Sequence, residues 1–374
     1  MPTAECPPAT DAVRAICTGI SGTERVGFLD EVARLAAEAG RPVEIFDVRE
    51  AMFQIAEDVG EPVEEETILD MFPPALVLLR AAALEKISSL CEQAGNYPDW
   101  IINTHAVFRW KNTLISGFDP YYLGRLRPDL YVTITAGVLT VRERLRRYPR
   151  WEETSVADLL VWREEEQWAT EEMARIHHKP QYLLGRRVTP RSLFRLMFEA
   201  DVRTAYLSYP MQHVEAAAER GLDAFKQRLE PRLVIFDPAD VDDFVVEGAA
   251  PPDRSGATSG VAVVEGEGPA ADPSHGPREL QHISDQIVFR DYKLIAQSDM
   301  VIVFYDVLVP SPGVISEMNY ALQTGKQVYG VWLPTTEPSP FFTRYCTRWF
   351  RSEDELVAYF ERIGVAEGTA SGRR

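Results

Sequence analysis

The chain has 374 residues, of which 45% are hydrophobic and 26% charged, and its formal net charge is −18. A single hydrophobic core stops growing at roughly 250–300 residues, so this length favours two domains of ordinary globular composition. A chain with so large an excess of negative charge lacks the positive charge that non-specific binding to nucleic acid requires.

The first half alternates strands with helices, which predicts an α/β domain with a parallel sheet over residues 11–190. Strands are predicted at residues 12–20, 42–48, 99–108 and 128–136, and helices at 26–40, 75–95 and 155–178. Residues 141–151 form an Arg-rich interval, and residues 182–203 are expected to bridge the two halves.

The second half repeats the alternation and predicts a second α/β domain over residues 203–363. Strands are predicted at residues 204–210, 232–238, 300–307 and 327–333, and helices at 213–229, 286–298 and 314–325. Residues 247–279 are rich in Gly, Pro, Ala and Ser, which predicts a flexible surface insertion. The predicted fold class is therefore α/β, with two three-layer domains and mainly parallel sheets.

Cysteine and histidine usage indicates a cytoplasmic protein without a metal centre. The four cysteines form no CxxC motif and are expected to be reduced thiols. His177 and His178 are adjacent, so a helix would point them about 100° apart. There is no apolar run of roughly 18 residues and no secretory signal pattern. We therefore expect no cofactor and no membrane partner.

A phosphate-binding loop is expected at residues 18–26, "TGISGTERV", between the first strand and the first helix. The functional pattern is G-x-x-x-x-G-K-[ST]. Aligned on Gly19, this chain has Glu24 for the second glycine, Arg25 for the lysine and Val26 for the hydroxyl that ligates Mg²⁺. Glu24 adds charge and bulk where a phosphate would lie, and Val26 cannot ligate a metal.

The surrounding sequence resembles the archaeal-type adenylate kinases, a group of P-loop nucleoside monophosphate kinases, over residues 11–185. The resemblance rests on "IINTHAVF" and on "SGFDPYYLGRLRPDLYVTITAGVLTVRERLRRYPR". It implies a kinase-derived fold that has lost phosphoryl transfer. Residual nucleotide binding would involve Gly19, Gly22, Thr23, Arg25, Arg142, Arg146 and Arg147. Alternatively, the arginines form a solvated helix face. We expect His105 to be a satisfied core residue.

The second half carries a spaced set of polar residues. Tyr206 lies in its first strand, and Asp291 precedes Asp299 by eight residues. Glu317 follows Gly313 and precedes Ala321, as in G-x(3)-E-x-x-x-A, and a Gly-Lys-x-Val follows at residues 325–328. Together these motifs resemble the nucleoside 2-deoxyribosyltransferases, including their branch of 2′-deoxynucleoside 5′-monophosphate N-glycosidases, over residues 203–335.

The resemblance implies a flavodoxin-like domain that acts on a small nucleotide or nucleoside, and a homo-oligomer. Glu317 would be the nucleophile, Asp291 the acid and Tyr206 the residue that orients Glu317. The substrate would be bound by Ser208, Met211, Ser311 and Gly313. The chemistry suits these residue types, because breaking an N-glycosidic bond develops positive charge on C1′ that a carboxylate can stabilise or attack.

Two positions depart from the family pattern. Ser311 replaces an Asp that binds sugar hydroxyls, and a hydroxyl suits a 5′-phosphate better than a carboxylate does. Tyr209 replaces a small glycine. The structural alternative is that Glu317 caps its own helix. The functional alternatives are a non-catalytic nucleotide sensor or scaffold, an active nucleoside monophosphate kinase, and an NAD-cleaving glycohydrolase.

Overall fold

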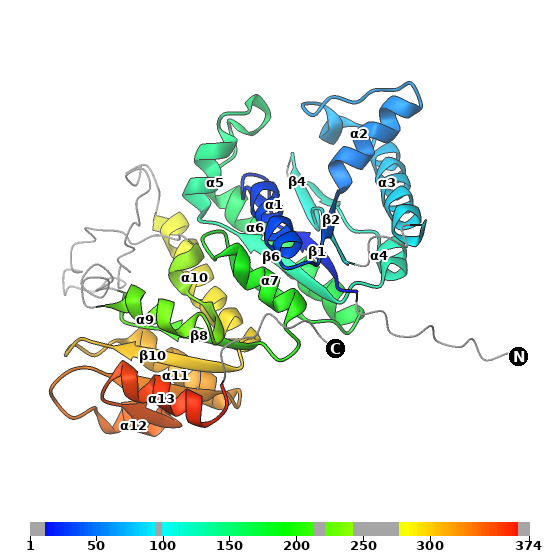
Figure 1. Cartoon of the computed structure of the whole chain (residues 1–374). Helices are drawn as coiled ribbons and strands as arrows, with labels where there is room; N and C mark the ends of the chain where they lie inside the picture. Colours follow the sequence, from blue (N-terminus) through cyan, green and yellow to red (C-terminus); the bar gives the residue numbers. More distant parts are fainter. Residues whose placement is uncertain (1–11, 94–98, 112, 212–220, 242–276, 366–374) are drawn as a thin grey trace, which may run out of the picture.

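The computed structural model describes residues 12–93, 99–111, 113–211, 221–241 and 277–365. It contains two five-stranded parallel sheets, each covered by helices, as Figure 1 shows. The predicted fold class is confirmed. None of the helices in these ranges is long and apolar enough to cross a membrane.

The first sheet has the order β2-β3-β1-β6-β7, so the chain runs to one side of β1 and then to the other. Its strands are β1 (Arg14–Thr18), β2 (Val43–Asp47), β3 (Asp99–Asn103), β6 (Leu130–Thr135) and β7 (Gln181–Gly185). Its helices are α1 (Arg25–Glu38), α2 (Val48–Asp58), α3 (Pro73–Gln93), α4 (Pro120–Leu126), α5 (Val138–Leu145), α6 (Val156–Ile176) and α7 (Pro190–Phe198), with 3₁₀ turns η1 (Ile68–Asp70) and η2 (Pro149–Trp151).

Two predictions for this half were wrong in detail. The strand predicted at residues 99–108 ends at Asn103, because the amides of Ala106 and Val107 bind the Glu166 side chain instead of a neighbouring strand. The chain then forms an antiparallel hairpin of β4 (Val107–Trp110) and β5 (Thr113–Ser116). The segment 182–203, predicted as a bridge, supplies the edge strand β7 and helix α7.

The second sheet has the order β12-β11-β10-β8-β9. Counted along the chain this is 2-1-3-4-5, the flavodoxin-like order. Its strands are β8 (Arg203–Ser208), β9 (Leu233–Phe236), β10 (Met300–Tyr305), β11 (Gln327–Trp332) and β12 (Arg348–Phe350). Its helices are α9 (Leu222–Leu229), α10 (Pro277–Gln297), α11 (Pro312–Gln323), α12 (Pro340–Tyr345) and α13 (Glu353–Arg362), with the 3₁₀ turn η4 (Pro238–Val241).

Two predicted segments lie largely outside the described residues. Of the insertion predicted at 247–279, the structure describes only the last three residues, which begin α10. That helix therefore starts nine residues before the predicted one at 286–298. Of the helix predicted at 213–229, the structure describes α9.

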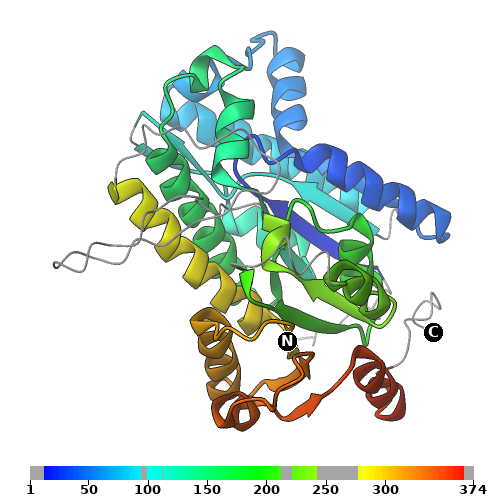
Figure 2. The same ribbon diagram turned by 90° about the vertical axis from the view of Figure 1, so that its left-hand side faces the viewer.

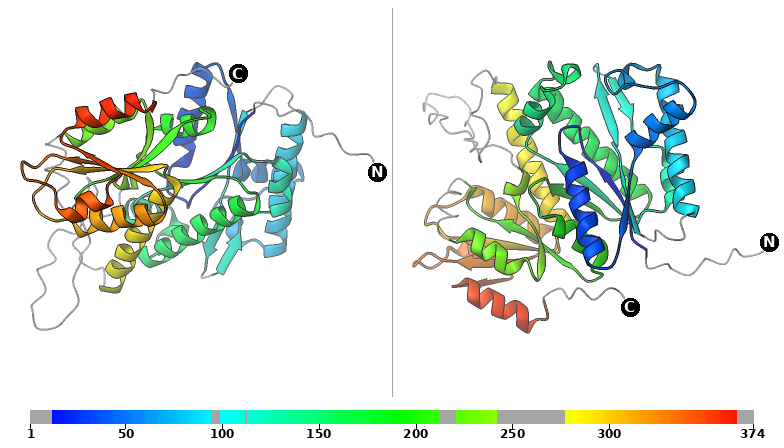
Figure 3. Two further views of the ribbon diagram at one scale, coloured as in Figure 1. Left: turned by 90° about the horizontal axis from the view of Figure 1, so that it is seen from below. Right: turned by 45° about the horizontal axis from the view of Figure 1, so that its top comes forward.

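Hydrophobic clusters join the layers. In Figure 3, α9 and α13 cover one face of the second sheet and α10 to α12 the other. The hydrophobic cluster under α10 to α12 is continuous with the core under α1 and α7 of the first domain. Phe28, Leu193, Tyr206 and Val303 all belong to this one buried cluster.

Helix α10 connects the domains directly. It packs along α6, as Figure 2 shows, and also contacts β7 and β8. The side chain of Gln297 bonds both the amide and the carbonyl of Leu183 in β7. At the other end, Arg163 of α6 donates to Gln286 at 2.7 Å.

Candidate functional site

The first candidate site lies where the second sheet reverses its strand order, between the neighbouring strands β8 and β10. Ligands of open α/β sheets bind outside the carboxyl ends of the strands at such a point. Ser208 ends β8, and α11 follows β10 after a short loop. Glu317, on α11, is therefore presented at the position where the fold favours a site.

The structure contradicts the alternative that Glu317 caps its helix. Ser311 is the N-cap of α11, and its hydroxyl accepts from the amide of Val314 at 3.5 Å. Pro312 begins the helix, and the first turn contains no acidic residue. Glu317 lies in the second turn, beyond the amides that a cap would bind.

Glu317 is partly buried and held by β8. The hydroxyl of Ser208, which is fully buried, donates to Glu317 Oε2 at 2.5 Å. Ser208 was predicted to bind substrate, but here its hydroxyl orients the carboxyl. Burial, and next the charge of Asp291, raise the pKa of Glu317 to about 8, although Ser208 and Tyr206 act to lower it.

Asp291 supplies the second carboxyl, from α10. Its side chain is buried, and Oδ1 accepts from Arg290 Nε at 3.0 Å and Nη2 at 2.9 Å. A guanidinium that donates twice to one carboxylate fixes the orientation of that carboxylate. Arg290 is therefore part of the site, although it was not among the predicted site residues.

Tyr206, on β8, is fully buried and lies near both carboxyls. Its hydroxyl makes no hydrogen bond of ordinary geometry in the described part of the chain, yet it is near enough to Glu317 to lower the carboxyl's pKa. Burial, followed by the charges of Asp291 and Glu317, raises the pKa of Tyr206 well above its ordinary value. The fold thus brings the three predicted catalytic residues together.

Tyr209 and its neighbours form a buried ionic cluster beside this site. The Tyr209 hydroxyl donates to Asp237 Oδ1 at 2.8 Å, and Lys226 Nζ bonds both Asp237 at 2.9 Å and Asp240 at 3.0 Å. Tyr209 is thereby fixed in the space that a glycine would leave open. The side chain of Met211, predicted to touch substrate, packs against the cluster under α9 and α13.

Asp299, the second Asp of the spaced motif, has a structural role. Its Oδ2 accepts from the amide of Thr204 at 2.8 Å and from the Thr204 hydroxyl at 3.1 Å. Gly313 lies exposed in the first turn of α11, and an added Cβ would meet only the Ser311 hydroxyl, 4.0 Å away.

The loop after β1 is closed by the protein's own side chains. Glu166 of α6, which is almost fully buried, accepts from the amides of Gly19 and Ala106, each at 2.9 Å, and of Val107 at 2.8 Å. Burial raises the pKa of Glu166 despite these bonds. The Gly19 amide, predicted to meet a phosphate, is therefore already occupied.

Arg25 lies across the same loop. Its Nε donates to Asn103 Oδ1 at 3.0 Å and its Nη1 to the carbonyl of Ile20 at 3.3 Å. Its Nη2 lies 3.3 Å from His105 Nε2. Glu24, where the pattern has glycine, adopts a left-handed conformation with φ 54° and pairs with Arg144 at 3.0 Å. A phosphate could not enter this loop without displacing Arg25.

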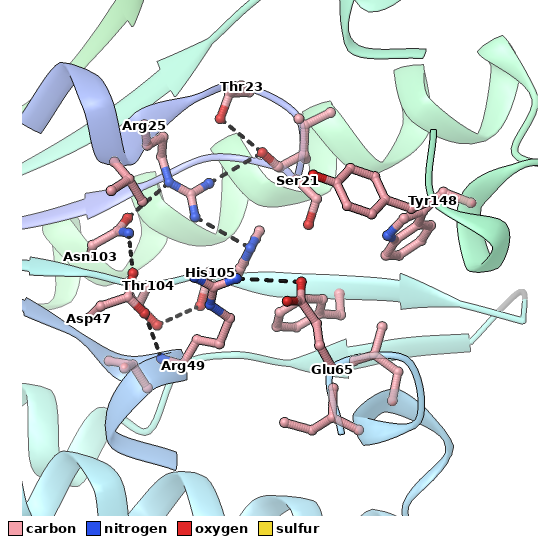
Figure 4. A pocket seen from close by; sticks show the side chains of 18 of the residues that line it. Ser21, Thr23, Arg25, Asp47, Arg49, Glu65, Asn103, Thr104, His105 and Tyr148 are labelled. Carbon is pink, nitrogen blue, oxygen red and sulfur yellow. Dashed lines mark hydrogen bonds and ion pairs between the residues drawn. The ribbon is translucent and has the colours of Figure 1, made fainter. Parts of the chain in front are cut away.

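The loop forms one wall of a cavity of about 400 Å³, the second candidate site. Figure 4 shows Arg25, Asn103 and Asp47 together on one side of it and Tyr148 on another. His105 lines the cavity and has a buried Nδ1 without a hydrogen-bond partner among the described residues, so the prediction of a satisfied core histidine was wrong.

The structure changes the predicted set of nucleotide-binding residues. Gly22, Thr23 and Arg25 line the cavity, whereas Arg142 and Arg146 do not. Arg147, also predicted, lines the cavity, and the lining arginines that the prediction missed are Arg49, Arg80, Arg144 and Arg150. A helix turns about 100° per residue, so neighbouring arginines face different ways, and sequence alone does not say which of them face inward.

In the described part of the chain, no cluster of three or more His, Cys, Asp or Glu side chains is positioned to hold a metal ion. No protein-family model matches the chain. No curated protein matches it either.

The solved structures that resemble the chain include a 2-deoxyribosyltransferase from the psychrotolerant bacterium Bacillus psychrosaccharolyticus. It has 11% identity, covers 42% of this chain and 91% of its own, and has a TM-score of 0.29. A conserved protein from Enterococcus faecalis V583 has 14% identity, covers 43% and 99%, and has a TM-score of 0.28.

Proposed function

We propose that the second domain cleaves, or transfers across, the N-glycosidic bond of a nucleotide or nucleoside. The observation that carries this proposal is the meeting of Glu317 with Ser208, Tyr206 and Asp291 at the strand-order switch of the second sheet. Enzymes that break glycosidic bonds usually use two carboxyl groups in one site.

The reaction would proceed in two balanced steps. An ionised Glu317 oxygen attacks C1′ while the bond from C1′ to the base nitrogen breaks, and Asp291 protonates the departing base. Water, or a second base, then attacks C1′ and gives a proton to the Asp291 carboxylate, while the bond from C1′ to Glu317 breaks and the Glu317 carboxylate is released. The two carboxyls share one proton at neutral pH, because each disfavours the charge of the other. In the productive form that proton lies on Asp291.

The N-terminus of α11 supports a phosphorylated substrate. Ser311 offers a hydroxyl there, and the amide of Gly313 has no partner within the first turn of a helix. An oxygen acceptor such as a 5′-phosphate suits these donors and the positive end of the helix dipole. This favours a nucleotide over a nucleoside.

The test is base release, followed by chromatography, from nucleoside 5′-monophosphates, nucleosides and NAD. The enzymes compared are the wild type, Glu317→Gln and the surface control Glu31→Gln. We expect release by the wild type and by Glu31→Gln, and a loss of at least about a thousandfold in Glu317→Gln, as expected for a lost nucleophile. Equal rates in the wild type and Glu317→Gln would refute the proposal.

The pH profile tests this assignment. In the proposed mechanism the productive form holds one proton, on Asp291, and the pair of carboxyls loses that proton near pH 8, the pKa of Glu317. We therefore expect kcat/KM to fall above about pH 8, and a kcat/KM that keeps rising above that pH would contradict the role of Asp291 as the acid.

A further inference from the structure

Helix α10 carries the buried carboxyl of Asp291 and also a polar stripe that faces the first domain. The stripe consists of Gln286, Lys293 and Gln297, which are spaced by seven and four residues. At 3.6 residues per turn these three side chains lie within about 40° of one another around the helix, and Asp291 lies about 140° from Gln286. Contacts that hold the stripe therefore also fix the direction in which Asp291 points.

Gln286 anchors the stripe to α6 of the first domain. Its side-chain amide donates to the carbonyl of Leu160 at 2.9 Å, and its oxygen accepts from Arg163 Nη2 at 2.7 Å. Both partners belong to α6. An amide side chain that uses a donor and its acceptor at the same time has one orientation, so Gln286 fixes α10 against α6.

Gln297 anchors the stripe to β7, eleven residues further along. Its amide donates to the carbonyl of Leu183 at 2.9 Å, and its oxygen accepts from the Leu183 amide at 2.8 Å. β7 is an edge strand of the first sheet, and an edge strand has backbone groups that no neighbouring strand binds. The Gln297 side chain supplies the partner that a further strand would have supplied.

The two glutamines lie on either side of Asp291 along the helix, at about 7.5 Å before it and about 9 Å after it. Between them, Lys293 lies 3.8 Å from Glu164 and 3.9 Å from Glu171 of α6. Ion pairs this long contribute little, so the geometry is set mainly by the two glutamines. A helix that is bonded on both sides of a residue cannot slide or rotate there without breaking one of these contacts.

We propose that the first domain positions the acid of the second domain: Gln286 and Gln297 bind α10 to α6 and β7 and thereby fix Asp291 beside Glu317. The inference rests on the proposed function for the role of Asp291 as the acid. Both glutamines act through Asp291 and are positioning residues. The first domain thus contributes to the chemistry through α6 and β7.

The kinetic test uses the full chain with Gln286→Met, Gln297→Met and both together, because methionine has a similar length but cannot replace the amide bonds. The control is Gln323→Met, which removes an exposed amide of α11 that bonds Asn319. Two substrates are compared, the nucleotide that the wild type cleaves best and 7-methylguanosine 5′-monophosphate. The base of the second is positively charged and departs without accepting a proton.

A displaced acid slows only the substrate that needs its proton. We expect kcat/KM for the first substrate to fall about tenfold or more in the double variant, and kcat/KM for the methylated substrate to change little. Asp291→Asn should show the same pattern with a larger loss. Equal losses on both substrates, or the same losses in Gln323→Met, would overturn the proposal.

A second measurement requires no activity. Burial, and next the charge of Asp291, raise the pKa of Glu317, while Ser208, Tyr206 and Arg290 lower it. NMR titration of ¹³C-labelled glutamate carboxyls follows this pKa, and the Glu317 signal is the one absent from Glu317→Gln. The glutamine variants should lower the pKa of Glu317 by moving Asp291 away.

The same substitutions should leave the pKa of Glu317 unchanged in an Asp291→Asn background, because the charge that they displace is then absent. A pKa that is unchanged in the glutamine variants, or that falls equally in the Asp291→Asn background, would contradict the positioning of Asp291.

These results distinguish the inference from the proposed function. If the wild type releases no base from any substrate, the proposed function fails, and the titration still decides whether the first domain fixes Asp291 beside Glu317. If the double variant does not fold, as circular dichroism would show, each single variant loses only two hydrogen bonds and carries the same expectations.

Discussion

The variant Glu317→Gln should be more stable than the wild type, by an amount that grows with pH. The folded protein raises the pKa of this carboxyl from 4.5 to about 8. Below about pH 4.5 the carboxyl is protonated in both states and contributes no pH dependence. Between the two values the unfolded chain has released the proton and the folded chain has not, so wild-type stability falls as pH rises. Glutamine keeps the shape and the acceptor for Ser208 but never ionises.

The magnitude follows from the size of the shift. Each pKa unit corresponds to about 1.4 kcal/mol. The wild type therefore loses up to about 3 kcal/mol by pH 7, and up to about 5 kcal/mol once the pH exceeds the folded pKa. Glu317→Gln should regain this free energy of unfolding. A residue that the proposed chemistry needs therefore lowers the stability of the wild type.

The assay is urea unfolding of the wild type, Glu317→Gln and the exposed control Glu31→Gln at about pH 5, 7 and 9. We expect the difference in unfolding free energy to be small at the lowest pH and largest at the highest, for Glu317→Gln alone. A difference that is independent of pH, or a variant that is less stable at every pH, would refute the reasoning.

Ser208→Ala removes the donor that lowers the pKa of Glu317, so the alkaline fall of kcat/KM should move up by about one to two pH units; an unmoved profile would exclude this role. Gly19→Ala should destabilise by about 3 kcal/mol, because Gly19 has φ 148° and an added Cβ would lie 2.3 Å from a carbonyl oxygen. Gly27→Ala, whose Cβ meets nothing within 4 Å, should instead stabilise by about 0.5–1 kcal/mol, and thermal unfolding compares the two. Glu166→Ala should cost about 3–5 kcal/mol in urea unfolding, since it leaves three amides without their acceptor; a loss below about 1 kcal/mol would contradict that account.

The layout of the sheets was readable because it follows from patterns that repeat over many residues. Runs such as Met300–Tyr305 are apolar throughout, as strands buried on both faces must be. Short or half-exposed strands were missed. The strand Arg348–Phe350 has three residues, and Thr113–Ser116 is largely exposed, so neither has a buried pattern to detect.

The grouping of Tyr206, Asp291 and Glu317 was expected for a different reason, which is that their spaced motifs resemble those of a known family. The direction in which a long side chain turns is not specified in that way. Arg25 folds back over its own loop, and Glu166 points inward although it belongs to a run of four charged residues, 163–166, in α6. Such choices depend on partners distant in sequence, which one chain alone does not reveal.

The buried set that runs from Phe28 to Val303 without a break limits how this protein can be divided. Cutting the chain between the two sheets would expose apolar side chains on both fragments, and such surfaces promote aggregation. Neither half should therefore be obtainable as a well-behaved separate module, and recombining one half with a foreign partner would require a matching apolar face. Each half therefore supplies part of the other's interior.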